Sequence, residues 1–269
     1  MFKLKDDFYI GKELFFILGP CVIENEKTVF QVAEKLRKLS EDLSFNFIFK
    51  ASFDKANRTS INSYRGPGLK KGLAILKKVK ENFDIPVLTD IHEPYQAEPV
   101  AEVVDIIQIP AFLSRQTDLL LSAGKTQKPI NVKKAQFSAP WDMKNIYEKI
   151  SSTGNQKIFF TERGTSFGYN NLIVDITSIP LMKKEGFLVV IDATHSVQKP
   201  SAEGNRTGGR RDLAPYIARA GVSVGADGVF MEVHPDPDKA LSDGPNSIRL
   251  NDLGDIISKL LRIRRAVND

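Results

Sequence analysis

The sequence predicts a (β/α)8 barrel with a small β-hairpin at its N-terminus, and three observations support this fold. First, strand and helix signals alternate eight times along 269 residues, and this fold typically needs about 250 residues. Second, the strands are short, continuous apolar runs, as at residues 187–191, which is typical of parallel strands buried on both faces. Third, these runs stop at polar residues such as Asp192 and His195, where α/β enzymes place their reactive groups.

The predicted elements follow one another in a regular order. Residues 1–12 alternate loosely around Asp6 and Asp7 and reach Gly11, which predicts a hairpin that plugs one end of the barrel. Apolar runs predict eight strands, at residues 14–18, 45–49, 86–89, 105–109, 130–132, 158–161, 187–191 and 228–231. Apolar residues at helical spacing predict eight helices, at residues 27–43, 69–83, 93–103, 115–124, 142–150, within 171–184, 211–224 and 253–267.

One other architecture shares this alternation, namely the open, doubly wound parallel sheet. The dinucleotide-binding signature that often accompanies it, Gly-x-Gly-x-x-Gly after the first strand, does not occur in the sequence. No linker and no low-complexity segment divides the chain. We therefore expect residues 1–269 to form a single barrel domain, with residues 1–12 as its hairpin.

Composition limits the classes of function. A hydrophobic content of 42% and a charged content of 26% are typical of a globular protein. The single cysteine excludes an internal disulfide and suits a reducing cytoplasm. The N-terminus lacks signal-peptide features, and no apolar run approaches the roughly 18 residues of a membrane span, so we expect a cytoplasmic protein. A net charge of +5 suits small anionic substrates but is too weak to indicate nucleic-acid binding.

Ionisable residues recur where the predicted strands end. They are Cys21, Lys50, Asp90, Lys133, Arg163, His195 and Glu232. Burying so many such groups at one rim is costly unless they share solvent and partners. Because side chains alternate along a strand, Lys50 and Lys133 are expected to face the barrel interior. Two lysines at one mouth repel each other, so we expect an anion to bind between them.

Three of these residues are also potential metal ligands. Cys21, His195 and Glu232 offer a thiolate, an imidazole and a carboxylate, and Asp243 follows on the loop after the last strand. This mixed set suits Zn²⁺ or Fe²⁺ better than Mg²⁺, which prefers oxygen ligands. No local motif such as His-Glu-x-x-His supports the site. From the residues alone, a buried structural cysteine and a structural histidine are the more common case.

Two connections are long enough to suggest a function. The connection at residues 51–68 carries Lys55, Arg58 and Thr59, and basic plus hydroxyl side chains are what a phosphate monoester requires. Its alternative interpretation is an ordinary polar surface loop, although its length is unusual for a barrel connection. The connection at residues 197–209 follows His195 directly and contains three glycines, which predicts a mobile lid over the site.

Eight segments together carry a resemblance to a known family. They are Gly-Pro-Cys at 19–21, Lys-Ala-Ser-Phe-Asp-Lys-Ala-Asn-Arg-Thr-Ser at 50–60, Thr-Asp-Ile-His-Glu at 89–93, Gln-Ile-Pro-Ala at 108–111, Asn-Val-Lys-Lys at 131–134, Thr-Glu-Arg-Gly-Thr at 161–165, Asp-Ala-Thr-His-Ser at 192–196 and Gly-Val-Phe-Met-Glu at 228–232. In this order, and from about residue 15 onward, they resemble the 3-deoxy-D-manno-octulosonate 8-phosphate synthases. Lys-Ala-Asn-Arg at 55–58 is the most specific segment, because the related 3-deoxy-arabino-heptulosonate 7-phosphate synthases usually carry Lys-Pro-Arg-Thr there.

The resemblance implies a (β/α)8 barrel, usually a homotetramer, that acts in lipopolysaccharide biosynthesis. The implied reaction condenses phosphoenolpyruvate with D-arabinose 5-phosphate and water and releases phosphate. The alternative is the related heptulosonate synthase reaction, which uses erythrose 4-phosphate. Family members with cysteine at the position of Cys21 require a divalent metal, and members with asparagine do not. The resemblance therefore implies one Zn²⁺ or Fe²⁺ per subunit, with Mn²⁺ as a third option, and a metal that orients groups.

The resemblance also implies roles for individual residues. Cys21, His195, Glu232 and Asp243 would be the metal ligands, and His195 would also act in catalysis. The phosphate of phosphoenolpyruvate would be held by Lys133, Arg163 and Arg115, and its carboxylate would lie beside Lys50 and Ser52. The sugar phosphate would pass Lys55, Asn57 and Asp90, with Lys55 stabilising the developing alkoxide. Its phosphate would be gripped by Arg58 and Thr59 of a neighbouring subunit, where the family commonly has serine in place of Thr59.

Overall fold

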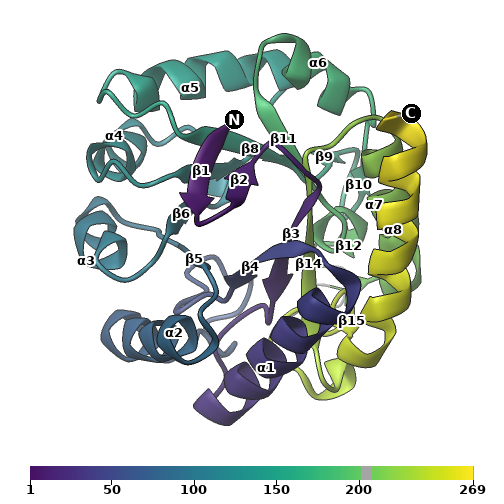
Figure 1. Cartoon of the computed structure of the whole chain (residues 1–269). Helices are drawn as coiled ribbons and strands as arrows, with labels where there is room; N and C mark the ends of the chain where they lie inside the picture. The colour runs from purple at the N-terminus through teal and green to yellow at the C-terminus, as the bar shows by residue number, and fades with distance from the viewer. Residues whose placement is uncertain (201–207, 269) are drawn as a thin grey trace.

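A closed parallel barrel surrounded by helices forms the body of the protein (Figure 1). The computed structural model describes residues 1–200 and 208–268. The barrel strands are β3 (Phe15–Gly19), β4 (Asn46–Lys50), β5 (Val87–Asp90), β6 (Ile106–Ile109), β7 (Ile130–Lys133), β8 (Ile158–Glu162), β11 (Leu188–Asp192) and β14 (Gly228–His234). The barrel closes because β11 pairs with β14, with Val190 opposite Gly228. The predicted barrel is therefore confirmed, and the open sheet is excluded.

In residues 1–200 and 208–268, eight α-helices pack outside the strands, close to their predicted positions. They are α1 (Glu26–Leu43), α2 (Leu69–Phe83), α3 (Ala97–Ala101), α4 (Thr117–Lys125), α5 (Met143–Ser151), α6 (Ser178–Lys184), α7 (Ala214–Ser223) and α8 (Leu253–Asn268). The helix α3 is shorter than predicted because residues 94–96, which begin with Pro94, form a 3-10 turn before it.

Short strands that the sequence did not predict lie in the connections. The strands β9 (Thr165–Ser166) and β10 (Leu172–Ile173) form a small hairpin, so α6 begins well after residue 171. The strand β12 (Gln198–Lys199) pairs with β13 (Gly208–Gly209), and β15 (Ile248–Arg249) pairs with the end of β14. Strands of two residues are too short to produce a visible hydrophobic period, which explains why they were missed.

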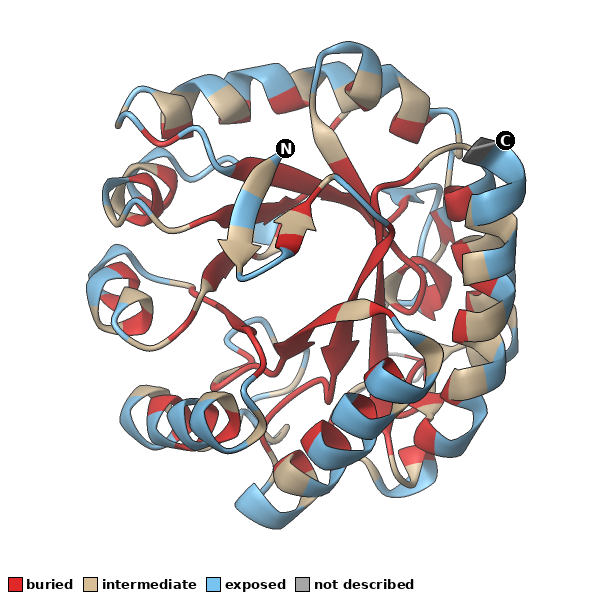
Figure 2. Ribbon diagram, viewed as in Figure 1, coloured by how far each residue is buried: buried red, intermediate tan, exposed pale blue. Residues whose placement is uncertain are grey.

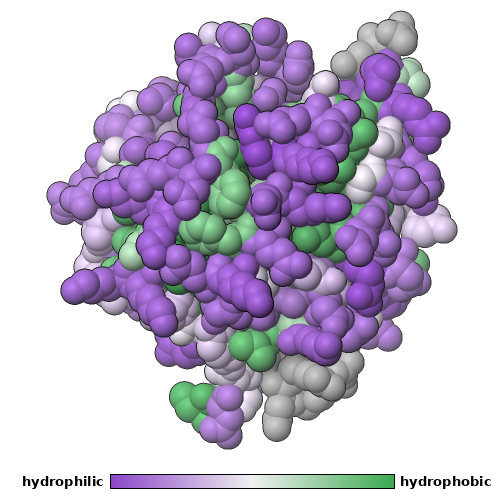
Figure 3. All heavy atoms as spheres, turned by 60° about the horizontal axis from the view of Figure 1, so that its bottom comes forward, coloured by the Kyte–Doolittle hydropathy of each residue, from purple (hydrophilic) through white to green (hydrophobic). Residues whose placement is uncertain are grey.

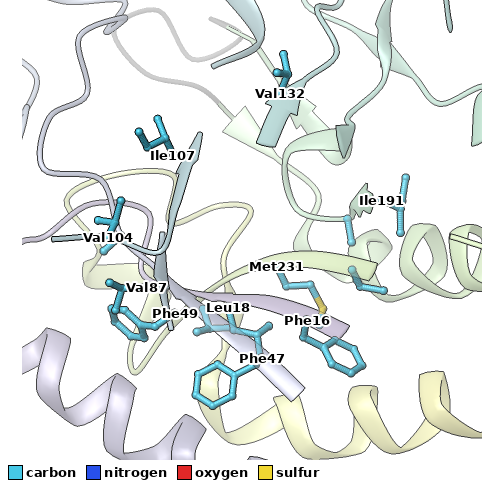
Figure 4. Packing of buried hydrophobic residues seen from close by; sticks show 14 of the residues in the cluster. Phe16, Leu18, Phe47, Phe49, Val87, Val104, Ile107, Val132, Ile191 and Met231 are labelled. Atoms are coloured by element: carbon cyan, nitrogen blue, oxygen red, sulfur yellow. The ribbon is translucent and has the colours of Figure 1, made fainter. Parts of the chain in front are cut away.

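Most apolar side chains lie in the layer between the barrel and the helices. Phe47, Val132 and Met231 belong to this layer, which Figure 4 shows from close by. Figure 2 shows the barrel strands buried along most of their length and the helices exposed on their outer faces. As predicted from the alternation, Phe47 and Val132 point to the helices and Lys133 points into the barrel, where its Nζ lies 3.8 Å from the centre of the Phe230 ring.

The N-terminal hairpin closes one end of the barrel. The strands β1 (Phe2–Lys5) and β2 (Phe8–Ile10) pair antiparallel, in front of the barrel strands in Figure 1. Phe8 and Ile10 join an inner core that includes Phe15 and Phe159, whose ring centroids are 6.1 Å apart at an interplanar angle of 80°. The predicted plug is confirmed, and it leaves the opposite mouth of the barrel for ligands.

The outer surface carries mainly hydrophilic side chains. On the face shown in Figure 3, apolar side chains appear only as patches between hydrophilic ones. None of the helices in the described part of the chain combines the length and the apolar character needed to cross a membrane.

The inner core makes Phe159 a test of the hairpin's contribution to stability. We expect Phe159→Ala to lower the free energy of unfolding by about 3–5 kcal/mol, because it leaves a cavity among Phe2, Phe15 and the rest of the inner core. Urea denaturation followed by circular dichroism measures the change. The control is Phe167→Ala, since Phe167 is 68% exposed and should have little effect; equal effects of the two variants would contradict the assignment of Phe159 to a tightly packed core.

Candidate active site and metal centre

A cavity of about 470 Å³ lies among the residues that follow the carboxyl ends of the barrel strands. Five basic side chains line it, namely those of Lys50, Lys55, Arg58, Lys133 and Arg163. They come from the ends of three strands and from the long connection after β4. So many cations around a small volume favour a ligand, or a pair of ligands, with several negative charges.

Lys50 is held rigidly at the end of β4. Its Nζ donates hydrogen bonds to Ser52 Oγ at 2.8 Å and to the carbonyl oxygen of Cys21 at 3.2 Å. The Ser52 hydroxyl in turn donates to Asp90, which ends β5. Burial, followed by the nearby charge of Lys55, lowers the pKa of Lys50. Burial opposes the ionisation of Asp90, but Lys50 and His92 hold the pKa of this carboxyl well below its usual value. Ser52 is fully buried, so it positions Lys50 from behind the cavity wall.

A second buried pair joins β7 to β11. Lys133 Nζ donates to Asp192 Oδ2 at 2.6 Å, and the same carboxylate oxygen lies 2.7 Å from His195 Nδ1. Asp192 also accepts a hydrogen bond from the backbone N–H of His195 at 2.9 Å. Burial opposes ionisation of Asp192, but His195 and Lys133 together keep its pKa far below the usual value. Asp192 therefore orients both a cation of the cavity and the imidazole of His195.

Arg163 follows β8, and one nitrogen of its guanidinium group already donates hydrogen bonds within the protein. Its Nη2 donates to Gln198 Oε1 at 2.6 Å and to the carbonyl oxygen of His195 at 3.3 Å. Its Nη1 is buried and has no hydrogen-bond partner within residues 1–200 and 208–268. A buried donor without a partner is costly, so a bound anion is the natural acceptor for this N–H group.

The residues around Glu232 fit a divalent cation. Ligand atoms of Cys21, Glu232 and Asp243 all lie within 4.8 Å of one another. Both carboxylate oxygens of Glu232 are buried and lack hydrogen-bond partners among the described residues. Burial opposes ionisation of Glu232, but His195 and then Lys55 hold its pKa well below the usual value, so the carboxylate is charged.

Cys21 and His195 complete this fit. Burial, followed by Asp243 and Glu232, raises the pKa of the Cys21 thiol well above its usual value, so only a bound cation would make it a thiolate. The Nε2 atom of His195 lies 3.3 Å from Glu232 Oε1. His195 does not, however, belong to the group of Cys21, Glu232 and Asp243 whose ligand atoms all lie within 4.8 Å of one another. The donor set of one sulfur, two carboxylates and an adjacent imidazole suits Zn²⁺ or Fe²⁺.

The long connection after β4 supplies one side of the cavity. Asn57, Arg58 and Thr59 all line it. Arg58 Nε donates to the carbonyl oxygen of Tyr64 at 3.0 Å, whereas its Nη2 is buried without a hydrogen-bond partner in the described ranges. The connection thus presents an uncommitted guanidinium donor, as its composition predicted.

The structure brings most of the predicted site residues together. Those that line the cavity are Lys50, Lys55, Asn57, Arg58, Thr59, Asp90, Lys133, Arg163, His195 and Asp243. Cys21, Ser52 and Glu232 are buried among them. Arg115 lies apart, because it is exposed ahead of α4 and outside the cavity lining. The lid predicted at residues 197–209 falls mostly outside the described residues, which omit 201–207.

Several residues that contribute to the cavity have no role among the predictions made from the sequence. His92 has its Nε2 atom 3.1 Å from Asp90, and Gln198 accepts the hydrogen bond of Arg163. Gln108 and Gln136 also line the cavity. Gln108 could have been found from alternation, since it lies between Ile107 and Ile109, which face the helices. Gln136 and Gln198 lie in connections, where no periodic pattern indicates direction.

Comparison with known proteins defines the family. The family model described as "DAHP synthetase I family" matches residues 2–267. This chain belongs to that family. A relative named "2-dehydro-3-deoxyphosphooctonate aldolase" from Desulfatibacillum aliphaticivorans is 57% identical over 259 residues, which are 96% of this chain and 95% of the relative. A protein of the same name from Geobacter sulfurreducens is 56% identical over 252 residues, which are 94% and 93% of the two chains.

The names of these relatives denote the octulosonate 8-phosphate synthases, which the eight sequence segments resemble. The predicted family membership is therefore confirmed, and the protein is an enzyme of this family. The heptulosonate alternative has support only from the family description.

The buried pair of Lys133 and Asp192 generates a prediction about stability. We expect Asp192→Asn to lower the free energy of unfolding by about 3–5 kcal/mol, because it leaves the buried ammonium of Lys133 without its counter-charge. The matched control is Asp84→Asn, which removes an exposed pair with Lys5; its denaturation midpoint should match that of the wild type. Similar midpoints for all three proteins would show that the pair is not held as described.

Proposed function

We propose that this enzyme condenses phosphoenolpyruvate with D-arabinose 5-phosphate and water to give 3-deoxy-D-manno-octulosonate 8-phosphate and phosphate. The observation that carries this proposal is the single cavity in which five basic side chains surround a volume suited to two phosphorylated reactants. Relatives at 55–57% identity, which carry the corresponding name, support the same reaction. The reaction forms a bond between C3 of the enol and the aldehyde carbon, water adds at C2, and the C–O bond to phosphate breaks.

Lys133 and Arg163 would hold the phosphate of phosphoenolpyruvate. The buried Nη1 atom of Arg163 supplies a donor without a protein acceptor in the described chain, and the ammonium of Lys133 lies on the same cavity wall. Lys50 would face the carboxylate, with Ser52 fixing the lysine from behind. Arg115 can contribute only if its exposed side chain swings toward the cavity, so its role stays a prediction. Holding both reactants in register can reduce the barrier by about 7–11 kcal/mol.

Lys55, Asn57 and Asp90 would line the path of the sugar phosphate. Lys55 Nζ lies 3.8 Å from Glu232 Oε1, near the centre of the charged cluster, so we assign it the stabilisation of the alkoxide that forms from the aldehyde. Arg58 and Thr59 would bind the sugar phosphate group. In the single chain they line the cavity of their own subunit, whereas the family resemblance implies that they serve a neighbouring one.

The metal would be held by Cys21, His195, Glu232 and Asp243. A divalent cation bound there would supply a fixed positive charge that orients a substrate and the attacking water. Zn²⁺ and Fe²⁺ fit the donor set best, and Mn²⁺ is the third candidate. His195 is kept in orientation by Asp192 from β11, so a proton on Nδ1 leaves Nε2 free to act as a ligand or in catalysis.

Three further properties belong to the proposal. We propose that residues 1–269 form one domain, since one apolar layer surrounds the whole barrel. We also propose a homotetramer, which the family resemblance implies. A cytoplasmic location suits the buried free thiol of Cys21 and the phosphorylated substrates.

A substrate panel tests the reaction. Phosphate release from phosphoenolpyruvate should require arabinose 5-phosphate. The value of kcat/KM with erythrose 4-phosphate should be lower by a factor of about ten or more, because the shorter sugar makes fewer contacts in the cavity. The control is Lys55→Met, which should lose activity with both sugars by about 10²–10³-fold. A preference for erythrose 4-phosphate would establish the heptulosonate reaction instead.

Removal of the metal tests the metal centre. Treatment with a strong chelator should abolish activity, and added Zn²⁺, Fe²⁺ or Mn²⁺ should restore it, while elemental analysis of the purified protein should find about one ion per subunit. Cys21→Asn should stay active after chelation if the metal only orients groups. Full activity of the chelated wild type would overturn the metal assignment, and an inactive Cys21→Asn would overturn the orienting role.

A further inference from the structure

We propose that Arg211 is a positioning residue for the loop that carries Asp243, and that through this loop it sets the geometry of the candidate metal centre. Arg211 lies just before α7, between the segment that follows His195 and the helix itself. It does not line the substrate cavity. The inference rests on the proposed metal site, but part of its test does not require a metal.

The loop with Asp243 covers Cys21 and holds a conformation that needs support. Asp243 Oδ2 accepts a hydrogen bond from Cys21 Sγ at 3.1 Å, and Ser242 Oγ lies 2.8 Å from the same sulfur. Asp243 has a positive φ of 47°, which residues other than glycine adopt at an energetic cost. Such a backbone persists only where surrounding contacts determine it.

Arg211 supports this loop through the residue that follows Asp243. Its Nη2 donates to the carbonyl oxygen of Gly244 at 2.8 Å and pairs with Asp238 Oδ1 at 3.0 Å. A Cβ atom added at Gly244 would lie only 2.2 Å from the carbonyl oxygen of Pro237. The residue next to Asp243 is therefore pressed against Pro237 and bonded to Arg211, which fixes the direction of the Asp243 side chain.

The glycines just before Arg211 add a second contact. A Cβ atom at Gly209 would lie 1.8 Å from Asn246 Oδ1, and Asn246 Nδ2 donates to the carbonyl oxygen of Gly208 at 3.5 Å. The backbone N–H of Asn246 donates in turn to the carbonyl oxygen of Asp243 at 3.0 Å. The described end of the connection after β11 thus touches the loop after β14 at two points, Gly244 and Asn246.

Arg249 offers a matched control. It pairs with Asp238 Oδ2 at 3.1 Å and with Asp236 Oδ1 at 3.7 Å. It therefore shares the carboxylate of Asp238 with Arg211, but both of its ion-pair partners precede residues 242–246, the part of this connection that carries Asp243. Loss of Arg249 removes a similar charge from the same area without removing the hydrogen bond to Gly244.

The first test uses the reactivity of Cys21, the only cysteine of the chain, in metal-free protein. Arg211→Gln should let a small neutral thiol reagent modify Cys21 about tenfold faster, because the loop that covers the sulfur opens more often. Arg211→Lys should stay close to the wild type, since an ammonium can still donate to Gly244, and Arg249→Gln should match the wild type. Equal rates for Arg211→Gln and the wild type would overturn the proposal.

The second test measures the affinity for Co²⁺ by its thiolate-to-metal absorption. Arg211→Gln should bind Co²⁺ about 10–100-fold more weakly than the wild type or Arg249→Gln. If Arg211 acts through Asp243, the double variant Arg211→Gln/Asp243→Asn should bind no more weakly than Asp243→Asn alone. Additive losses would show that Arg211 acts elsewhere and would overturn the proposal.

The two tests separate this proposal from the proposed function. A wild type that binds no Co²⁺ contradicts the metal site, while the thiol reaction still decides whether Arg211 holds the loop. Circular dichroism and melting temperature establish that each variant is folded. If Arg211→Gln does not fold, the substitute variant is Gly244→Ala, whose added methyl group would collide with Pro237 and displace the loop. Faster modification of Cys21 in this variant would support the proposal that the loop controls access to the site. Modification at the wild-type rate would contradict it.

Discussion

Mutual repulsion among buried like charges is the constraint on which the architecture of the site depends. Lys50, Lys55, Lys133 and Arg163 all reach one mouth of the barrel, and each would be costly to bury alone. The protein resolves this by placing carboxylates from other strands of the barrel next to most of them. Asp192 faces Lys133, while Asp90 and Glu232 lie near Lys50 and Lys55. What remains uncompensated is a set of donors aimed into the cavity, which two phosphorylated ligands can neutralise.

The same arrangement places the candidate metal beside the substrates. Glu232 belongs to the charged network and to the triad of possible ligands, so the two sites share one carboxylate. Neither carboxylate oxygen has a hydrogen-bond partner among the described residues, but the ammonium groups of Lys50 and Lys55 lie 3.8 Å from Oε1 and the sulfur of Cys21 is within 4.8 Å of a ligand oxygen. A cation bound there would repel Lys55 and attract the oxygens of a substrate, so metal and lysine would act on neighbouring atoms of the same reactants.

The closed barrel makes this crowding possible. The hairpin β1–β2 and the phenylalanine core fill the opposite end, so apolar side chains such as Phe15 and Phe159 occupy the inner volume there. Parallel strands of similar length then deliver their last residues to one level. The loops contribute the less rigid elements: the connection after β4 brings Arg58, and the connection after β14 brings Asp243. Contacts between loops, such as that of Arg211 with Gly244, fix what the strands do not.

The sequence by itself determined the barrel, the inward direction of Lys50 and Lys133, and the residues available as ligands. These features follow from local periods and from the rule that parallel strands end at one rim, and neither depends on distant contacts. Only the tertiary structure decided which charges pair, as in the bond between Lys133 and Asp192, and that Arg115 lies outside the cavity. Pairing depends on the register between strands and on the paths of the connections, and no pattern within a single segment encodes either of them.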